Sequence, residues 1–538
     1  MKSVIFANTR TGSYEDPTGY QNSTLRYVPP VDFPEYLAST LGRAKIMRVW
    51  ITLDEYYDYK TGEKYPDYDI GRARCPVKEM YYHYDWGRTV PAPSGTRFRD
   101  YLRSHSENAD VLLLGVRRLE REVSDGIISY EKYTEIFSDA VDYCKSIAPN
   151  IKYIECCNEP ELSSFGALNS EEYYRIYMCA YRAVKELNRT RGYDIPLLIG
   201  GDGVPSPLVR IDLWEGFLRL LSETKTEDKP IDFYSYHHYD IGARSNLLRM
   251  GFARESEEMG IVDRYRLIVE LHERLLEKYG LPKAELFMDE WGKAAATNNK
   301  YDNLLNATGN ILTMNAQVQG KLGDFKTFPW CTFHNPELQI SYTQYTLRED
   351  GSYAATPNAL ALIMLHRLRG DILRIHNTAF RGNDTRYRAL AVRDGDVISV
   401  VVCNPRGVPE KCTIEIREAE AGDWRVEEYM CNSDQYNHSS LLRNAEHRRG
   451  IAARRFARSY CDQHNNDAYS RSPAVASCRK ERPGHCTENR IIFLWDCCLT
   501  QQSHCLYCVY YALRSRISMN ASLSSSRSID IHPPDISS

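Results

Sequence analysis

The stretch Ile151-Lys-Tyr-Ile-Glu-Cys-Cys-Asn-Glu-Pro160 has the composition of a short core strand that runs into a polar turn. A second stretch, Ala284-Glu-Leu-Phe-Met-Asp-Glu-Trp-Gly292, has the same design. Short apolar runs bounded by turn residues are typical of strands that are buried on both faces. Each of these two strands is expected to end in a glutamate, Glu159 in the first stretch and Glu290 in the second.

Short apolar runs of this kind recur as far as about residue 370, and longer amphipathic segments lie between them. The predicted strands are Val4–Asn8, Ile46–Thr52, Val111–Val116, Ile151–Cys157, Leu197–Gly200, Phe233–Tyr236, Leu286–Met288 and Phe325–Phe328. The predicted helices include Tyr130–Ser146, Glu171–Leu187, Val262–Tyr279 and Asn303–Gln319. Eight strands that alternate with helices predict a TIM (β/α)8 barrel over residues 1–370.

The pattern changes after Gly370. Residues 387–403 read as two strands joined at Asp394-Gly395, and this dipeptide is a strong hairpin signal. Further short strands are expected at Lys411–Ile416 and Trp424–Tyr429. We therefore expect a small β-sandwich domain over residues 371–438.

The last hundred residues differ in composition from the rest of the chain. Residues 441–538 hold seven of the sixteen cysteines, and 13 of their 14 basic residues are arginine. No apolar periodicity persists there, so the segment does not predict a packed core. We interpret residues 439–538 as a disordered tail or as an aberrant segment, such as one from a shifted reading frame.

The overall composition argues against several classes of protein. The formal net charge is only −4, which indicates neither a nucleic-acid nor a membrane partner. The N-terminus lacks the apolar segment of a signal peptide, and the cysteines are scattered. A cytoplasmic location is therefore expected, or secretion if a leader is missing. The oligomeric state is left open.

The two glutamates carry the functional prediction. Active residues of a barrel sit at the carboxyl ends of its strands, and the fourth and seventh strands lie across the mouth from each other. Glu159 and Glu290 can therefore converge despite their separation in sequence. Two carboxylates that face each other across a sugar ring are what retaining glycoside hydrolysis needs. An oligosaccharide or polysaccharide is the expected substrate.

The motifs also resemble a known group. Asn158-Glu159-Pro160 after the fourth strand, with a Glu after the seventh, is similar to clan A of the glycoside hydrolases, the 4/7 superfamily. Within the clan, the likeness is greatest to glycoside hydrolase family 39, the β-xylosidase family, which the Thr356-Pro357 helix before a β-sandwich also fits. Asp289-Glu290-Trp291 resembles family 51 arabinofuranosidases as well. The likeness covers about residues 1–438.

The resemblance implies two catalytic roles and two supporting ones. Glu159 matches the acid/base of the clan, and Glu290 matches its nucleophile. Asn158 would donate a hydrogen bond to the sugar 2-hydroxyl. Arg48, on the second strand, matches the clan's arginine and would keep Glu290 ionised.

Four further residues are assigned to substrate binding. His237 and Tyr239 match a His-x-Tyr pattern after the sixth strand, and Tyr239 would hydrogen-bond Glu290. Trp330, which ends the eighth strand, is expected to form a platform under the sugar, and Trp291 is placed in the same site. His237, His238 and Asp240 could in principle ligate a metal, but neighbours at a strand end point in different directions. We expect neither a metal nor an organic cofactor.

Two alternatives use the same barrel. The first is a non-catalytic carbohydrate-binding protein, although the presence of both carboxylates argues against it. The second is a transglycosylase that forms the same covalent intermediate. The sugar, its linkage and the choice between exo and endo cleavage are left open.

Overall fold

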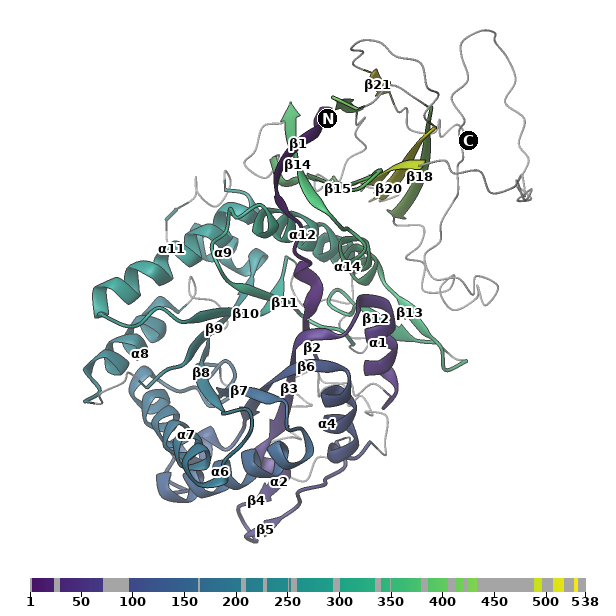
Figure 1. The fold of residues 1–538 in the computed structure, drawn as a ribbon. Helices are drawn as coiled ribbons and strands as arrows, with labels where there is room; N and C mark the ends of the chain where they lie inside the picture. The colour runs from purple at the N-terminus through teal and green to yellow at the C-terminus, as the bar shows by residue number, and fades with distance from the viewer. Residues whose placement is uncertain are drawn as a thin grey trace.

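Eight parallel strands form a barrel that is surrounded by helices (Figure 1). In barrel order, these strands are β2 (Tyr20–Asn22), β3 (Ala44–Thr52), β6 (Ala109–Arg117), β7 (Ile151–Cys156), β8 (Leu198–Val204), β9 (Phe233–Tyr239), β10 (Glu285–Gly292) and β11 (Lys326–Pro329). Beyond β11, the Thr332 N–H donates to the Asn22 carbonyl at 2.9 Å, so the last strand returns to the first. The TIM-barrel prediction is confirmed.

The computed structural model describes most of the barrel and parts of the remaining chain. The described residues are 2–23, 30–70, 96–162, 165–204, 210–225, 230–249, 251–252, 259–293, 300–333, 340–348, 350–378, 386–404, 413–419, 423–432, 488–495, 507–516 and 527–530. Among them, no helix is both long enough and apolar enough to cross a membrane.

The helices form the outer layer of the barrel (Figure 1). The longer ones are α1 (Phe33–Leu41), α4 (Phe98–Glu107), α6 (Tyr130–Ile147), α7 (Ser170–Arg191), α8 (Ile211–Glu223), α9 (Asp240–Arg249), α11 (Ile261–Tyr279), α12 (Lys300–Val318) and α14 (Pro357–His366). Shorter elements are η1 (Pro17–Gly19), α2 (Leu53–Tyr56) and α5 (Glu120–Ser124), with the hairpins β4 (Tyr57–Asp58)–β5 (Glu63–Lys64) and β12 (Tyr345–Leu347)–β13 (Tyr353–Ala355). All four helices predicted by residue range are present.

Local sequence explains where the long helix α7 begins. The Asn169 side chain accepts hydrogen bonds from the Glu171 and Glu172 N–H groups, and the Glu172 carboxylate accepts from the Asn169 N–H at 2.8 Å. This capping box satisfies N–H groups that have no partner inside the helix. The helix is therefore anchored just after the turn that carries Glu159.

The strand predicted at Val4–Asn8 does not belong to the barrel. It is part of β1 (Lys2–Ser13), which pairs antiparallel with β14 (Asp371–Thr378) and lies beside it in Figure 1. The first barrel strand is instead the short β2. Three residues are too few to show a hydrophobic period, and that is why the sequence pattern missed β2.

The β-domain expected after the barrel is a nine-stranded mixed sheet. Its order is β18 (Asp423–Asn432), β19 (Glu488–Trp495), β20 (Tyr507–Arg516), β16 (Val397–Cys403), β15 (Ala389–Asp394), β14, β1, β17 (Thr413–Arg417) and β21 (Arg527–Asp530). The hairpin predicted at Asp394-Gly395 joins β15 to β16, and Gly395 takes a φ of 54°, which glycine adopts without strain.

Three of these strands come from the segment for which the sequence predicts no regular structure. β19, β20 and β21 all lie beyond residue 438. Ile491-Ile-Phe-Leu-Trp495 and Val509-Tyr-Tyr-Ala-Leu513 are rich in β-branched and aromatic residues, which favour strands. The structure describes these three stretches as strands, while residues 433–487 lie outside the described residues, so the interpretation of residues 439–538 stays a prediction.

The barrel interior is filled in layers. The lowest layer is apolar and comes from six strands: Ile46, Leu113, Tyr153, Phe233, Phe287 and Phe328. Two residues farther along β3, Arg48 also points inward, because side chains on one face of a strand recur every second residue. The apolar floor therefore supports a polar layer at the mouth.

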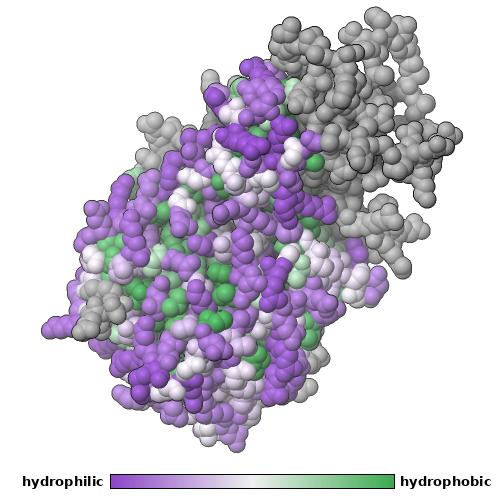
Figure 2. All heavy atoms as spheres, in the orientation of Figure 1, coloured by the Kyte–Doolittle hydropathy of each residue, from purple (hydrophilic) through white to green (hydrophobic). Residues whose placement is uncertain are grey.

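Hydrophilic residues predominate on the face of the molecule seen in Figure 2, and hydrophobic residues show only in small groups between them.

Candidate active site

Arg48 is the centre of the polar layer. Its side chain is fully buried, and it forms ion pairs with Glu155 at 2.6 Å, Glu290 at 3.0 Å and Asp289 at 3.2 Å. Its guanidinium also lies 4.0 Å from the centre of the Trp50 ring. A buried cation is tolerated only when it is paired. Three carboxyl groups from β7 and β10 supply this pairing and raise the pKa of Arg48 against the effect of burial.

A glycine on β6 makes room for the contact between the Arg48 guanidinium and the Trp50 ring. A Cβ on Gly115 of β6 would lie 2.7 Å from the Trp50 ring, which is closer than carbon atoms can pack. Glycine at this position therefore lets the Trp50 ring lie flat against β6, where it supports the Arg48 guanidinium.

The two buried carboxyl groups beside Arg48 have pKa values that shift in opposite directions. Burial opposes ionisation of Glu155, but Arg48 and the Ser235 hydroxyl, 2.6 Å away, together lower its pKa. Burial and the neighbouring Glu155 instead raise the pKa of Asp289 well above its usual range. Of these two adjacent carboxyl groups, Asp289 is therefore the one that takes up a proton more readily, because two neighbouring buried carboxylates disfavour each other's charge.

A β-bulge turns Glu290 into the barrel. The pairing of β10 with β9 shifts register between Met288 and Glu290, and the pairing with β11 shifts between Met288 and Trp291. Regular alternation from the inward-facing Phe287 would place Glu290 outside. The bulge reverses this alternation, so Asp289 and Glu290 both approach Arg48.

Glu290 is held by two hydrogen bonds. Arg48 donates to its Oε1 at 3.0 Å, and the Tyr239 hydroxyl donates to its Oε2 at 2.7 Å. Burial and the nearby Glu290 raise the pKa of Tyr239, so this hydroxyl keeps its proton. The arrangement holds Glu290 as an oriented carboxylate.

Glu159 lies in the turn that follows β7. Its φ of 47° is in the left-handed region, and its N–H donates to the Gly203 carbonyl at 3.0 Å. Its side chain is 14% exposed, compared with 0% for Glu155. Glu159 is therefore reachable from the mouth of the barrel, whereas Glu155 is sealed beneath it.

His237 bridges the two carboxylates at the mouth. Its Nδ1 lies 3.0 Å from Glu159 Oε1 and 3.5 Å from Glu290 Oε2. On the other side of the ring, Arg48 Nη2 lies 3.5 Å from His237 Nε2. Because arginine can only donate, Nε2 is assigned as the acceptor, and the ring proton is assigned to Nδ1, which faces the carboxylates. Burial alone would lower the pKa of His237, but Glu290 and Glu159 raise it.

The bridge brings the two carboxylates close together. The contacting atoms of Glu159, His237 and Glu290 all lie within 4.8 Å of one another. Within the part of the chain that the structure describes, this is also the one group of His, Cys, Asp and Glu donors close enough to hold a metal ion. His238, by contrast, packs its ring against Tyr265 of α11, with ring centres 4.6 Å apart.

Asn158 is oriented by the same arginine. Its side-chain oxygen accepts from Arg48 Nη2 at 3.2 Å. An amide whose oxygen is engaged presents its NH₂ group as the remaining donor. This NH₂ group is the donor that the role expected of Asn158 requires, and that role stays a prediction.

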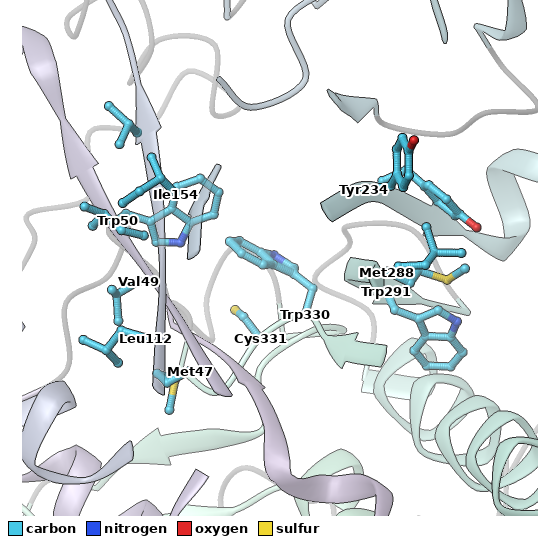
Figure 3. Packing of buried hydrophobic residues seen from close by; sticks show 14 of the residues in the cluster. Met47, Val49, Trp50, Leu112, Ile154, Tyr234, Met288, Trp291, Trp330 and Cys331 are labelled. Atoms are coloured by element: carbon cyan, nitrogen blue, oxygen red, sulfur yellow. The ribbon is translucent and has the colours of Figure 1, made fainter. Parts of the chain in front are cut away.

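The tryptophans separate into two groups, as Figure 3 shows. Trp330 faces Trp50 in an edge-on contact, with ring centres 6.4 Å apart, and Trp50 in turn contacts the Arg48 guanidinium. Trp291 points away from both rings toward the helices. Its ring centre lies 5.7 Å from that of Tyr265, and its ring packs against Gly309 of α12.

The prediction that Trp291 lines the site is therefore wrong. The register shift that turns Glu290 inward also turns the next side chain outward. Six of the eight predicted site residues are joined by hydrogen bonds or ion pairs, Trp330 adjoins them through Trp50, and Trp291 points elsewhere.

Sequence reasoning missed three polar contributors. Glu155 and Asp289 both stand in the quoted stretches, and a charged residue within an apolar strand is a signal of an inward partner. Tyr342, whose ring centre lies 5.4 Å from that of Tyr239, comes from a segment without any pattern that would reveal it.

Two solved structures share this architecture at low sequence identity. The glucosidase from Croceicoccus marinus is similar with a TM-score of 0.54 and 15% identity, over 96% of this chain and 99% of that chain. The glycoside hydrolase family 39 enzyme from Xanthomonas axonopodis pv. citri gives 0.52 and 12%, over 96% and 97%. No protein-family model and no curated protein matches the sequence. The likeness to these two structures is thus a likeness of fold.

Proposed function

We propose that this protein is a retaining glycoside hydrolase that acts by double displacement, with a β-xylosidase-like substrate. The observation that supports it is the approach of Glu159 and Glu290, whose facing atoms lie within 4.8 Å. Retaining enzymes hold their carboxyl groups roughly 5–5.5 Å apart, whereas inverting enzymes leave roughly 6.5–9.5 Å for a water molecule. The similar fold of two glycoside hydrolases is in agreement with this proposal.

The first half-reaction uses both carboxyl groups. Glu290, oriented by Arg48 and Tyr239, attacks the anomeric carbon and forms a glycosyl-enzyme ester. The bond from the anomeric carbon to the leaving oxygen breaks, and Glu159 gives that oxygen its proton. Asn158 donates to the 2-hydroxyl, and this contact strengthens in the transition state.

The second half-reaction reverses these roles. Glu159, now a carboxylate, takes a proton from a water molecule that attacks the anomeric carbon. The ester bond breaks and Glu290 is released as a carboxylate. Two displacements on the same carbon restore the original configuration. Trp330 would support the sugar ring during both steps.

A panel of aryl glycosides tests the proposal on the full chain. The panel includes β-xyloside and α-arabinofuranoside, and wild type is compared with Glu290→Ala. We expect activity on one sugar, its loss in Glu290→Ala, and its partial return with azide, which can occupy the space of the lost carboxylate. Glu273→Ala, on the exposed side of α11, is the matched control and should be as active as wild type.

The stereochemistry of the product completes the test. NMR should show that the wild-type product has retained configuration. The Glu290→Ala variant with azide should give a glycosyl azide of inverted configuration. An inverted wild-type product would contradict the double displacement. Inactivity of folded wild type across the panel would favour a carbohydrate-binding protein or an endo-acting enzyme.

A further inference from the structure

Glu161 is a buried carboxyl group that the proposed mechanism does not use. Only 8% of the residue is exposed, and neither side-chain oxygen has a hydrogen-bond partner among the residues that the structure describes. Burial raises the pKa of Glu161 to about 8. The group thus carries a proton at neutral pH and offers both an O–H donor and a carbonyl acceptor.

An unpartnered polar group of this kind is uncommon. Nearly all buried polar groups in proteins have hydrogen-bond partners, because burial without a partner is costly. Exceptions are frequent where a ligand completes the bonding. Glu161 therefore has the character of a group whose partner arrives with the substrate.

The position of Glu161 indicates which part of the substrate this would be. The turn from Glu159 is closed by the Leu162 N–H, which donates to the Glu159 carbonyl at 2.9 Å. Glu161 stands inside this turn, and the charged groups that act on its pKa are Glu159, His237 and Arg210. Arg210 precedes α8, after β8, whereas Glu290 comes from β10, two strands farther around the barrel.

We propose that Glu161 binds the leaving group, by a hydrogen bond to a hydroxyl of the second sugar. This inference rests on the proposed hydrolase function and on Glu159 as its acid. An acid must stand beside the oxygen that departs, and the nucleophile stands on the opposite side of the anomeric carbon. A residue next to the acid, on the side of β8, therefore faces the leaving sugar.

Other residues are already assigned to bind the glycone, the sugar that Glu290 attacks. Arg48, Asn158 and Tyr239 are hydrogen-bonded to one another or to Glu290 around the nucleophile. Glu161 forms none of these bonds. Two separate sets of polar groups thus correspond to the two sugars that a glycosidic bond joins.

Two substrates with the same glycone separate leaving-group binding from other roles. Xylobiose has a sugar as its leaving group, whereas 2,4-dinitrophenyl β-xyloside has an aromatic leaving group without a hydroxyl. If the aryl panel returns another sugar, the corresponding pair is used. The variant Glu161→Met keeps the length of the side chain but cannot form these hydrogen bonds. Glu161→Gln keeps a donor and an acceptor.

We expect Glu161→Met to lower kcat/KM for xylobiose about tenfold or more, which corresponds to one lost hydrogen bond. The value for the dinitrophenyl xyloside should change less than about twofold, and Glu161→Gln should recover most of the xylobiose activity. In the absence of substrate, Glu161→Met should raise Tm by roughly 1–3 °C, because it removes an unpaired buried polar group.

Other outcomes overturn the inference. Equal losses on both substrates would show that Glu161 acts on the fold or on Glu159 rather than on the leaving sugar. Unchanged xylobiose activity in folded Glu161→Met would show that it binds nothing. Inactivity of wild type on every substrate would instead refute the proposed β-xylosidase-like hydrolase itself. Glu273→Met serves as the surface control.

Discussion

Two pairs of carboxyl groups stand one above the other in this barrel, and both pairs come from β7 and β10. The upper pair, Glu159 and Glu290, has side chains that are 14% and 8% exposed. The lower pair, Glu155 and Asp289, is completely buried. Arg48 contacts both members of the lower pair and Glu290 of the upper pair.

Under the proposed mechanism, burial rather than residue type separates the two carboxyl groups that react from the two that support them. A carboxyl group that is partly exposed at the barrel mouth can contact a substrate. One that is buried beneath Arg48 can act only by orienting the arginine and balancing its charge. We infer that the lower pair positions Arg48 and that Arg48 in turn positions Glu290. Substitutions in the two pairs should therefore have different consequences.

The largest expected effect is that of Glu290→Gln. The amide keeps the shape but is a far weaker nucleophile, so kcat/KM for an aryl glycoside should fall about 10⁴-fold. Folding should be retained, as thermal unfolding can verify. A loss of only a few fold would remove Glu290 from the role of nucleophile.

Glu159→Gln should give a loss that depends on the leaving group. A disaccharide needs a proton on its departing oxygen, so we expect a decrease of about 10²- to 10⁴-fold in kcat/KM. A dinitrophenyl glycoside needs almost none and should suffer much less in the first step, which pre-steady-state release of dinitrophenol measures. Glu155→Gln, in the lower pair, should affect both substrates alike. The two pairs would not differ in role if Glu155→Gln showed the same dependence on leaving group.

Arg48→Met tests the connection between the pairs. Removing one partner leaves buried carboxylates uncompensated, and such losses typically cost about 3–5 kcal/mol of unfolding free energy. Chemical denaturation should show a decrease of this order. The Arg189 side chain is 71% exposed and forms a surface ion pair with Glu186, so Arg189→Met should change stability by less than about 0.5 kcal/mol.

Tyr239→Phe should have a smaller effect on catalysis. It removes the hydrogen bond of 2.7 Å to Glu290, and bonds to charged groups contribute about 1.5–3 kcal/mol. We expect kcat to fall about tenfold to a hundredfold in steady-state assays. The control is Tyr265→Phe, because the Tyr265 hydroxyl is buried outside the site beside His238. A comparable decrease in Tyr265→Phe would point to general destabilisation.

The smallest effect on activity is expected from Asp289→Asn, because the amide resembles the protonated form that the raised pKa of Asp289 favours. Its signature lies in stability. The folded pKa of Asp289 is raised above 3.8, so its stabilising contribution is complete below that pH and is lost as pH rises toward the folded pKa. Asp289→Asn should lose less stability than wild type between pH 4 and 7 in thermal unfolding. A steeper loss would mean that Asp289 is ionised in the fold.

Much of the barrel could be predicted because its strands are short, apolar and separated by amphipathic helices. Val111–Val116 and Phe233–Tyr236 lie in strands of the structure at nearly the predicted bounds. Tyr20–Asn22 could not be predicted, because it is a strand only through its neighbours β3 and β11. Likewise, the pairing of β1 with β14 joins residues more than 350 positions apart, and no local pattern encodes it.

The sequence by itself determined which residue types are available at each strand end: Asn158-Glu159 after one strand, Glu290 after another, and Arg48 on a third. These choices follow from local chemistry and from the alternation of strands and helices. Tertiary structure alone decided which way the β10 side chains face. The bulge after Met288 depends on the different registers that β9 and β11 impose on β10, so it turns Glu290 inward and Trp291 outward against the simple period of a strand.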